Sequence, residues 1–256
     1  MMNTVRAYIY RALHSLSTYA CLVMMFMFNF GFVSLYWYVE AFDYNTGSFI
    51  PVKYNSTIIS DFLDITSTGL YMAVIMVPLT VFLAADNRDG YIKNIACLQS
   101  RRYHIVFSRM IFSLIYSLFM FVTGFVILAV SLKCFYNAPF GFDIYSLKVI
   151  IMDYLIVYAF VIFVSFIMLA ARGTALPLIT GLLYSLGIQH IFSSLINYIF
   201  GDCFGIRGFD IDCIYLTTYN MDPEYKTLLA GNITAVLYIV ISGTLSVILM
   251  QKRDIK

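Results

Sequence analysis

Six apolar segments, each long enough to cross a lipid bilayer as a helix, constrain the fold of this chain more than any other feature. They cover residues 17–39, 64–85, 105–131, 150–171, 174–200 and 229–250. A hydrocarbon core about 30 Å thick needs about 20 helical residues. Backbone groups in lipid must be satisfied within the segment, which favours helices, and the alternating pattern of a membrane barrel is missing. The sequence therefore predicts an all-α polytopic membrane protein with six transmembrane helices, in one domain over residues 1–256.

The composition supports this assignment. Hydrophobic residues make up 61% of the chain and charged residues 12%, whereas a soluble domain is about 45–50% apolar and about 25% charged. We expect no cleaved signal peptide, because the first apolar run ends in Tyr36, Trp37 and Tyr38 rather than in a small-residue cleavage site.

The charges of the connecting segments predict the orientation. If the N-terminus is cytoplasmic, eleven of the sixteen Lys and Arg residues fall on the inner side, and eleven of the fourteen Asp and Glu residues fall on the outer side. Lys and Arg concentrate in cytoplasmic loops. We therefore expect both termini to be cytoplasmic. The segment 86–104 would then be an inner loop, and the acidic segment 201–228 an outer loop.

Residues 2–16 predict an amphipathic helix that lies in the membrane interface. Its apolar positions recur with helical spacing and are Val5, Tyr8, Ile9, Ala12, Leu13 and Leu16. Arg6, Arg11 and His14 lie off this face, and Arg6 and Arg11 are candidate anchors at the inner membrane surface. The alternative is that these residues form the cytoplasmic end of the first span.

Sequence motifs for catalysis are missing. The chain has neither a G-x-x-x-x-G-K-[ST] phosphate loop nor a G-x-G-x-x-G motif, and it lacks H-E-x-x-H and G-x-S-x-G. No Cys or His spacing is typical of a metal site. We therefore expect no catalytic residues, no metal and no cofactor in this chain, and no enzymatic activity of its own. No nucleic-acid partner is expected.

A few polar or helix-bending residues within the spans are candidates for a translocation path. They are Pro78, Pro177, Gln189, His190 and Asn197. Polar residues within membrane spans often mark function. For Gln189 and His190 the simpler interpretation is an inter-helix hydrogen bond. Asp64 and Asp153 are expected near outer span ends, where water would reach them.

Cys203 and Cys213 share one outer loop. They can form a disulfide in an oxidising compartment, or they can remain two free thiols.

The predicted cytoplasmic stretch from Asp86 to Arg109 carries five of the sixteen Lys and Arg residues. We expect Asp86 to Gly90 to end the helix of the second span. Beyond it, Tyr91, Ile92, Ile95 and Leu98 fall on one face of a short amphipathic helix that also holds Lys93 and Asn94. Arg101, Arg102 and Arg109 would then anchor the third span at the inner headgroups, with Arg109 able to snorkel.

This stretch resembles the permease subunits of type-2 ABC exporters. The shared pattern is an acid, three residues, Gly and a Lys-Asn helix, here Asp86 to Ile95, followed by Ser100-Arg101-Arg102 and Ser108-Arg109. The ending Gln251 to Ile255 is similar to the basic tail of small peptide-export and bacteriocin-immunity members. The sequence departs from the pattern at three positions: it has Asp86 where Glu is commoner in the family, Tyr91 where Thr is commoner, and Gln99 just before the Ser-Arg pair. The resemblance therefore does not extend to a substrate subgroup.

The resemblance implies a function and partners. Residues Gly90 to Leu98 would be the coupling helix, with Asp86 beside it, docking on two cytoplasmic ABC ATPase subunits that bind ATP and Mg. A second permease copy, or a related permease, would complete the path in a bacterial plasma membrane, surrounded by membrane lipid. The substrate would be an amphipathic or hydrophobic peptide, a bacteriocin or a toxic compound. Alternatives are export of a drug or lipid-linked glycan, or a non-transport assembly or sensor role.

Overall fold

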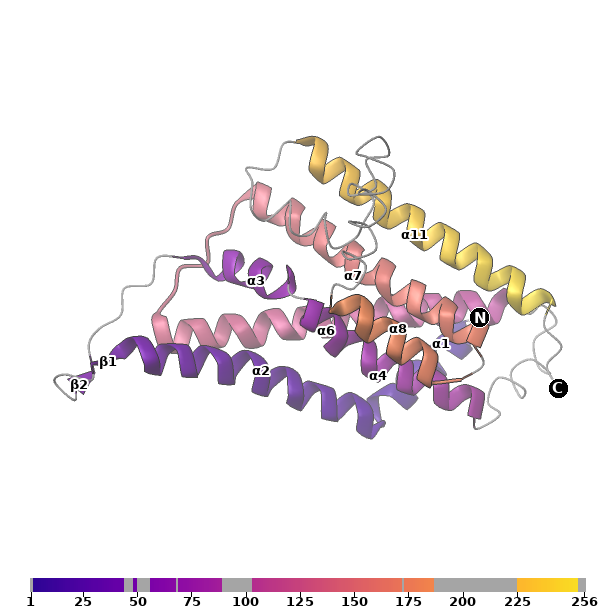
Figure 1. Ribbon diagram of the computed structural model, residues 1–256, viewed down its shortest axis with the longest axis horizontal. Helices are drawn as coiled ribbons and strands as arrows, with labels where there is room; N and C mark the ends of the chain where they lie inside the picture. Colours follow the sequence, from indigo (N-terminus) through magenta and orange to yellow (C-terminus); the bar gives the residue numbers. More distant parts are fainter. Residues whose placement is uncertain are drawn as a thin grey trace, which may run out of the picture.

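The computed structural model describes residues 2–43, 48–49, 56–67, 69–88, 103–171, 173–186 and 225–252. In these ranges the fold is a bundle of helices whose long members run side by side (Figure 1). The helices are α1 (Met2–Leu13), α2 (Leu16–Ala41), α3 (Ile58–Ser67), α4 (Gly69–Arg88), α6 (Tyr103–Tyr136), α7 (Ile144–Ala171), α8 (Ala175–Ser185) and α11 (Tyr225–Lys252). A two-residue antiparallel ladder, β1 (Phe42–Asp43) with β2 (Ser48–Phe49), is added to them.

Four of these helices are long and apolar enough to cross a bilayer. They are α2, α6, α7 and the Gly231–Lys252 part of α11. The pair α3 and α4 adds a fifth span if it is taken as one element bent by 58°. α8 covers only the first part of the segment 174–200, and residues 187–200 lie outside the described ranges. The chain is thus a helical membrane protein with several spans.

α7 forms the centre of the bundle. It packs against α11 along much of its length and also contacts α6, α8 and α4, and its side chains are buried on several faces. α2 and α11 lie on opposite sides of the bundle (Figure 1). Both expose rows of large apolar side chains. Such faces suit a hydrocarbon surrounding, where lipid tails take the place of a protein partner.

Tyrosine hydroxyls fasten neighbouring helices to α6. Tyr71 of α4 donates to the carbonyl oxygen of Phe121 at 3.2 Å. From α7, Tyr154 donates to the carbonyl of Leu114 at 2.9 Å, and Tyr158 to that of Met110 at 3.2 Å. A helical carbonyl has a second lone pair for such a bond. These aromatic side chains therefore hold the bundle together through their polar ends as well as their rings.

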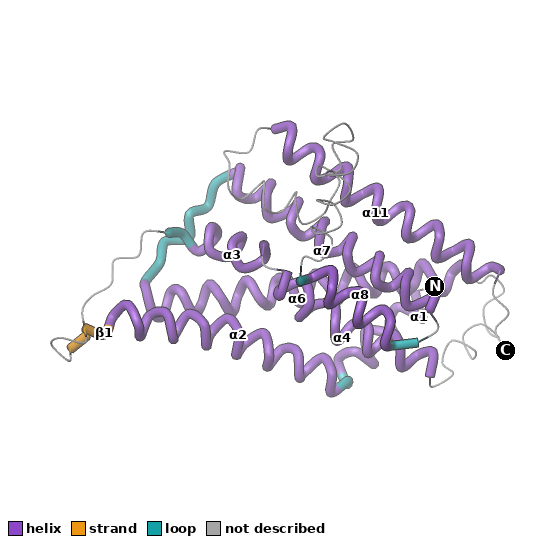
Figure 2. Tube along the Cα trace, viewed as in Figure 1, coloured by secondary structure: helices purple, strands orange, loops and turns teal. Residues whose placement is uncertain are grey.

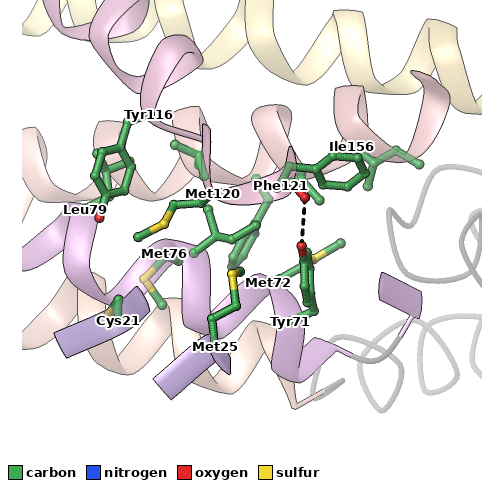
Figure 3. Packing of buried hydrophobic residues seen from close by; sticks show 14 of the residues in the cluster. Cys21, Met25, Tyr71, Met72, Met76, Leu79, Tyr116, Met120, Phe121 and Ile156 are labelled. Atoms are coloured by element: carbon green, nitrogen blue, oxygen red, sulfur yellow. Dashed lines mark hydrogen bonds between the residues drawn. The ribbon is translucent and has the colours of Figure 1, made fainter. Parts of the chain in front are cut away.

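Methionines fill much of the space between α2, α4 and α6. Met25, Met72, Met76 and Met120 are each at most 1% exposed and gather around the Tyr71–Phe121 hydrogen bond (Figure 3). Thioether side chains are unbranched and fit irregular gaps. This part of the core therefore tolerates small shifts of one helix against another better than a core of β-branched residues would.

The connection between α6 and α7 lies at the end of the bundle away from α1, as does the small β ladder (Figure 2). Asn137 and Gly141 have positive φ in this connection, 51° and 65°. The Ile58 N–H donates to the Pro139 carbonyl at 3.0 Å, which fixes the start of α3 to the connection. α7 begins at Ile144, six residues before the predicted span.

The earlier start of α7 corrects one expectation. Asp153 was expected near the outer end of the fourth span, in reach of water. It instead lies in the third turn of α7 and is 4% exposed. The helix continues into the polar segment before the apolar run, so a residue early in that run is already deep in the bundle.

Candidate functional site at one end of the bundle

α1, the end of α4, the start of α6 and the end of α11 meet at one end of the bundle (Figure 1). Met250 of α11 packs against Ile105 and Val106 of α6 in a small buried cluster, and α1 packs against α6. The predicted coupling segment joins α4 to α6, so it begins and ends here. We call this region the basal junction.

α1 is a helix of its own. It ends at Leu13, and the chain turns before Ser15 caps α2: the Ser15 side chain accepts a hydrogen bond from the Thr18 N–H at 3.3 Å. Hydroxyl side chains at this position satisfy a free N–H group of the first turn. Of the predicted apolar face, Val5, Tyr8 and Ala12 are buried. Leu13 and Leu16 are exposed because the turn carries them off the bundle.

Tyr8 is the deepest residue of α1. It is fully buried, and its ring lies 5.3 Å from Phe112 of α6 and 6.3 Å from Phe82 of α4, measured between ring centroids. Phe82 and Phe112 are 5.2 Å apart, so the three rings form one cluster. The Arg11 guanidinium carbon lies 5.3 Å from the Phe82 ring centroid, a cation–π distance. α1 is thereby packed onto both helices that flank the predicted coupling segment.

Arg109 lies inside the junction. Its Nε donates to the Tyr8 hydroxyl oxygen at 3.4 Å, and the residue is 4% exposed. It borders a cavity of about 20 Å³ that Ser113, Ser165 and Ser246 also line. The expectation of a lipid-headgroup anchor therefore does not hold for Arg109. Its position six residues into α6 and on the face toward α1 directs the side chain into protein rather than along the lipid surface.

The other predicted anchors differ from Arg109. Arg6 is exposed on α1, as expected for a residue off the apolar face, and Arg11 is partly buried beside Phe82. Arg101 and Arg102 lie outside the described residues, together with the coupling-helix positions Gly90, Tyr91, Ile92, Lys93, Asn94, Ile95 and Leu98.

Asp86 belongs to the last turn of α4, which continues through Asn87 to Arg88. The helix thus ends within the stretch from Asp86 to Gly90, as predicted. α4 therefore carries its helical geometry up to the edge of the predicted coupling segment.

The path candidates are only partly described. Pro78 is buried inside α4. Pro177 is buried in the first turn of α8, where the missing N–H costs no helical bond, so the expected kink does not occur at Pro177. α8 approaches α4 closely: a Cβ at Gly181 would overlap the Met76 side chain. Gln189, His190 and Asn197 lie outside the described residues, as do Cys203 and Cys213.

Several buried polar residues escaped prediction. Asn29 of α2 is 1% exposed, and its Nδ2 donates to the Met25 carbonyl at 3.0 Å. Asp153 of α7 and Arg109 of α6 carry opposite charges, and each is only 4% exposed. Each stands in a run of apolar residues with no periodic signal. Across the described ranges, no group of three or more His, Cys, Asp or Glu residues could hold a metal ion.

Comparison with known proteins adds no assignment. Neither a protein-family model nor a curated protein matches the sequence. The functional argument therefore depends on the residues of this chain and on the geometry of the basal junction.

Proposed function

We propose that this chain is the transmembrane permease subunit of an ATP-driven exporter that moves an amphipathic or hydrophobic substrate, such as a peptide, a bacteriocin or a toxic compound, out of a bacterial cell. The observation that carries the proposal is the basal junction. Tyr8, Phe82 and Phe112 join α1, α4 and α6 into one packed unit. The basic residues of the predicted coupling segment lie between two of those helices in the sequence.

A unit of this kind suits the transmission of force. A subunit without a phosphate loop must receive the energy of ATP through a contact with another protein. Closure of two ATPase subunits around ATP and Mg would displace the segment from Gly90 to Leu98. Because α4 is helical up to Arg88 and α6 from Tyr103, the displacement would reach both helices directly. The preference of ATP for the closed state supplies the free energy of the shift.

The packing between α4 and α8 would allow small movements of these two helices against each other. α4 touches α8 at Met76 and Gly181, and methionine side chains adapt to small shifts. Each permease would have six spans. In the proposed assembly, a second permease copy or a related permease would face α4 and α8 across the path. Pro78, Pro177, Gln189, His190 and Asn197 are the candidate path residues of this chain.

The proposed orientation in the membrane, with both termini cytoplasmic, is based on the distribution of Lys and Arg residues along the chain. α1 and the end of α11 lie at the same end, as expected if both termini are cytoplasmic. The excess of Lys and Arg assigns this end to the inner side. The basal junction would then face the compartment that contains ATP.

Site-specific photo-crosslinking in the native host tests the proposal. A benzophenone amino acid replaces Ile92 in the predicted coupling helix and, as a control, Phe142, which is 71% exposed at the other end of the bundle. We expect Ile92 to crosslink to a protein that carries a phosphate loop and hydrolyses ATP, and Phe142 not to do so. If Ile92 crosslinks only to proteins without a nucleotide site, the exporter assignment is wrong.

A further inference from the structure

A groove between α6 and α11 opens on the side of the bundle. α11 packs chiefly on α7, and it meets α6 where Met250 contacts Ile105 and Val106. Beside this contact the two helices leave a groove of about 530 Å³. It is bordered by Tyr103, Phe107 and Met110 of α6 and by Ile239, Val240, Gly243, Thr244, Val247 and Ile248 of α11. Small-molecule sites have volumes of about 300–1,000 Å³. The groove is thus large enough for a hydrocarbon chain.

The walls of the groove suit an apolar occupant. Phe107 and Ile248 are each 46% exposed, and Val240 is 54% exposed. The Thr244 hydroxyl, one of the polar groups on the described walls, already donates to the Ile241 carbonyl at 2.9 Å. Gly243 forms part of the floor, because a Cβ there would lie 2.9 Å from Met110 Cε. The groove lies along two helices that qualify as membrane spans, so hydrocarbon surrounds its opening.

The basal end of the groove carries positive charge. Lys252 is exposed in the last turn of α11 and comes four residues after Ile248, which lines the groove. Residues four apart share a helix face and are separated by about 6 Å along the axis. Lys252 therefore stands on the groove's own face, one turn beyond its apolar wall. Tyr103 borders the same end, and aromatic residues of this kind favour the headgroup level.

We infer that this groove is a binding site for an anionic phospholipid. One acyl chain lies between Phe107 and Val240, and the phosphate group pairs with Lys252. The site is formed by residues of α6 and α11 alone, and it does not depend on whether the chain is an exporter. Apolar walls alone would accept any lipid, so the lysine makes the site selective for negative charge.

Quenching of a single tryptophan by brominated lipids tests the site. Trp37 is the one tryptophan of the chain, so Trp37→Phe supplies a background without tryptophan. In this background Phe107→Trp places a reporter in the groove wall. Ile241→Trp is the matched control, because Ile241 is 54% exposed, like Val240, but does not line the groove. The full chain is reconstituted in phosphatidylcholine vesicles with a minor fraction of phosphatidylglycerol, and one of the two lipids is brominated at a time.

We expect brominated phosphatidylglycerol to quench the Phe107→Trp reporter several-fold more strongly than its bulk fraction predicts, and the Ile241→Trp reporter in proportion to that fraction. Lys252→Gln should lower the preference at the groove roughly fivefold, the effect of one basic group near an anionic surface. Lys252→Arg should retain it. Equal preference at both reporters, or a preference unaffected by Lys252→Gln, would overturn the site. Absence of quenching by either lipid at Phe107→Trp, as a second copy covering the groove would cause, would also overturn it.

Discussion

Tyr8 and Arg109 are 101 residues apart in the chain, yet the Arg109 Nε donates a hydrogen bond to the Tyr8 hydroxyl at 3.4 Å inside the bundle. Both side chains are buried. A charged group in such a place is costly unless polar partners surround it. The contact therefore fixes α1 to the first turns of α6 and makes the N-terminal helix a structural part of the basal junction.

Substitutions of Tyr8 should separate the hydrogen bond from the packing. Tyr8→Phe keeps the contacts with Phe82 and Phe112 and removes the hydroxyl that accepts from the Arg109 Nε, which should lower the free energy of unfolding by about 1.5–3 kcal/mol. Tyr8→Ala also leaves a cavity and should cost about 3–5 kcal/mol. Unfolding of the purified protein in detergent measures both. Tyr10, 65% exposed on the same helix, supplies the control: Tyr10→Ala should change stability by at most about 0.5 kcal/mol. Equal effects at Tyr8 and Tyr10 would contradict the docking of α1.

Two helical glycines should respond in opposite ways to the same change. At Gly124 an added Cβ would occupy the position of the Tyr71 hydroxyl. Gly124→Ala must therefore displace Tyr71 from the Phe121 carbonyl, and overpacking of this kind costs about 1–3 kcal/mol. At Gly31 no atom lies within 4 Å of the added Cβ, so Gly31→Ala should stabilise α2 by about 0.5–1 kcal/mol. Thermal unfolding compares the two. Destabilisation by Gly31→Ala together with tolerance of Gly124→Ala would show that α4 and α6 are packed differently.

Cysteine labelling tests the orientation. Cys134 is exposed near the end of α6 away from the basal junction, whereas Cys21 is buried in α2. In a Cys203→Ser/Cys213→Ser background, a membrane-impermeant maleimide added to intact cells should modify Cys134. Cys97, in the predicted inner loop, should react only after permeabilisation, and Cys21 only after unfolding. Reaction of Cys97 but not Cys134 in intact cells would reverse the topology.

Hydropathy predicted where the chain meets lipid better than where its helices begin. The first span was placed at 17–39 and α2 covers Leu16–Ala41, because both of its ends coincide with changes in polarity. α7, in contrast, begins at Ile144, ahead of Lys148. A helix can extend through polar residues beyond the hydrocarbon, and hydropathy does not register that extension. The bend between α3 and α4 escaped because it falls at Thr66 to Gly69, a short polar stretch inside the predicted span 64–85 that hydropathy averaged over the whole span does not register.

The burial of individual polar residues could not be predicted. α1 has one apolar stripe, so its period identified Tyr8 as inward-facing. α6 and α7 are apolar on all sides, so nothing in the sequence indicates which face of either helix looks inward. Arg109 and Asp153 were therefore assigned to water or headgroups from their distance to the span ends alone. Arg109 is buried because α1 packs against α6. A contact between residues so far apart in the chain cannot be detected in a single sequence.

In the proposed mechanism, force enters the membrane domain through the segment after α4, and association of the chain with an ATPase is the test of this step. The tagged chain is purified from its native host in mild detergent, and the ATP hydrolysis that co-purifies is measured for the wild type, for Ile92→Asp/Ile95→Asp and for Gly90→Pro. We predict that the wild type retains a stoichiometric ATPase and that both variants, expressed at the wild-type level, lose it. Tyr10→Ala should leave it unchanged. Wild-type amounts of co-purifying ATPase with the Ile92→Asp/Ile95→Asp and Gly90→Pro variants would show that this segment does not bind the ATPase.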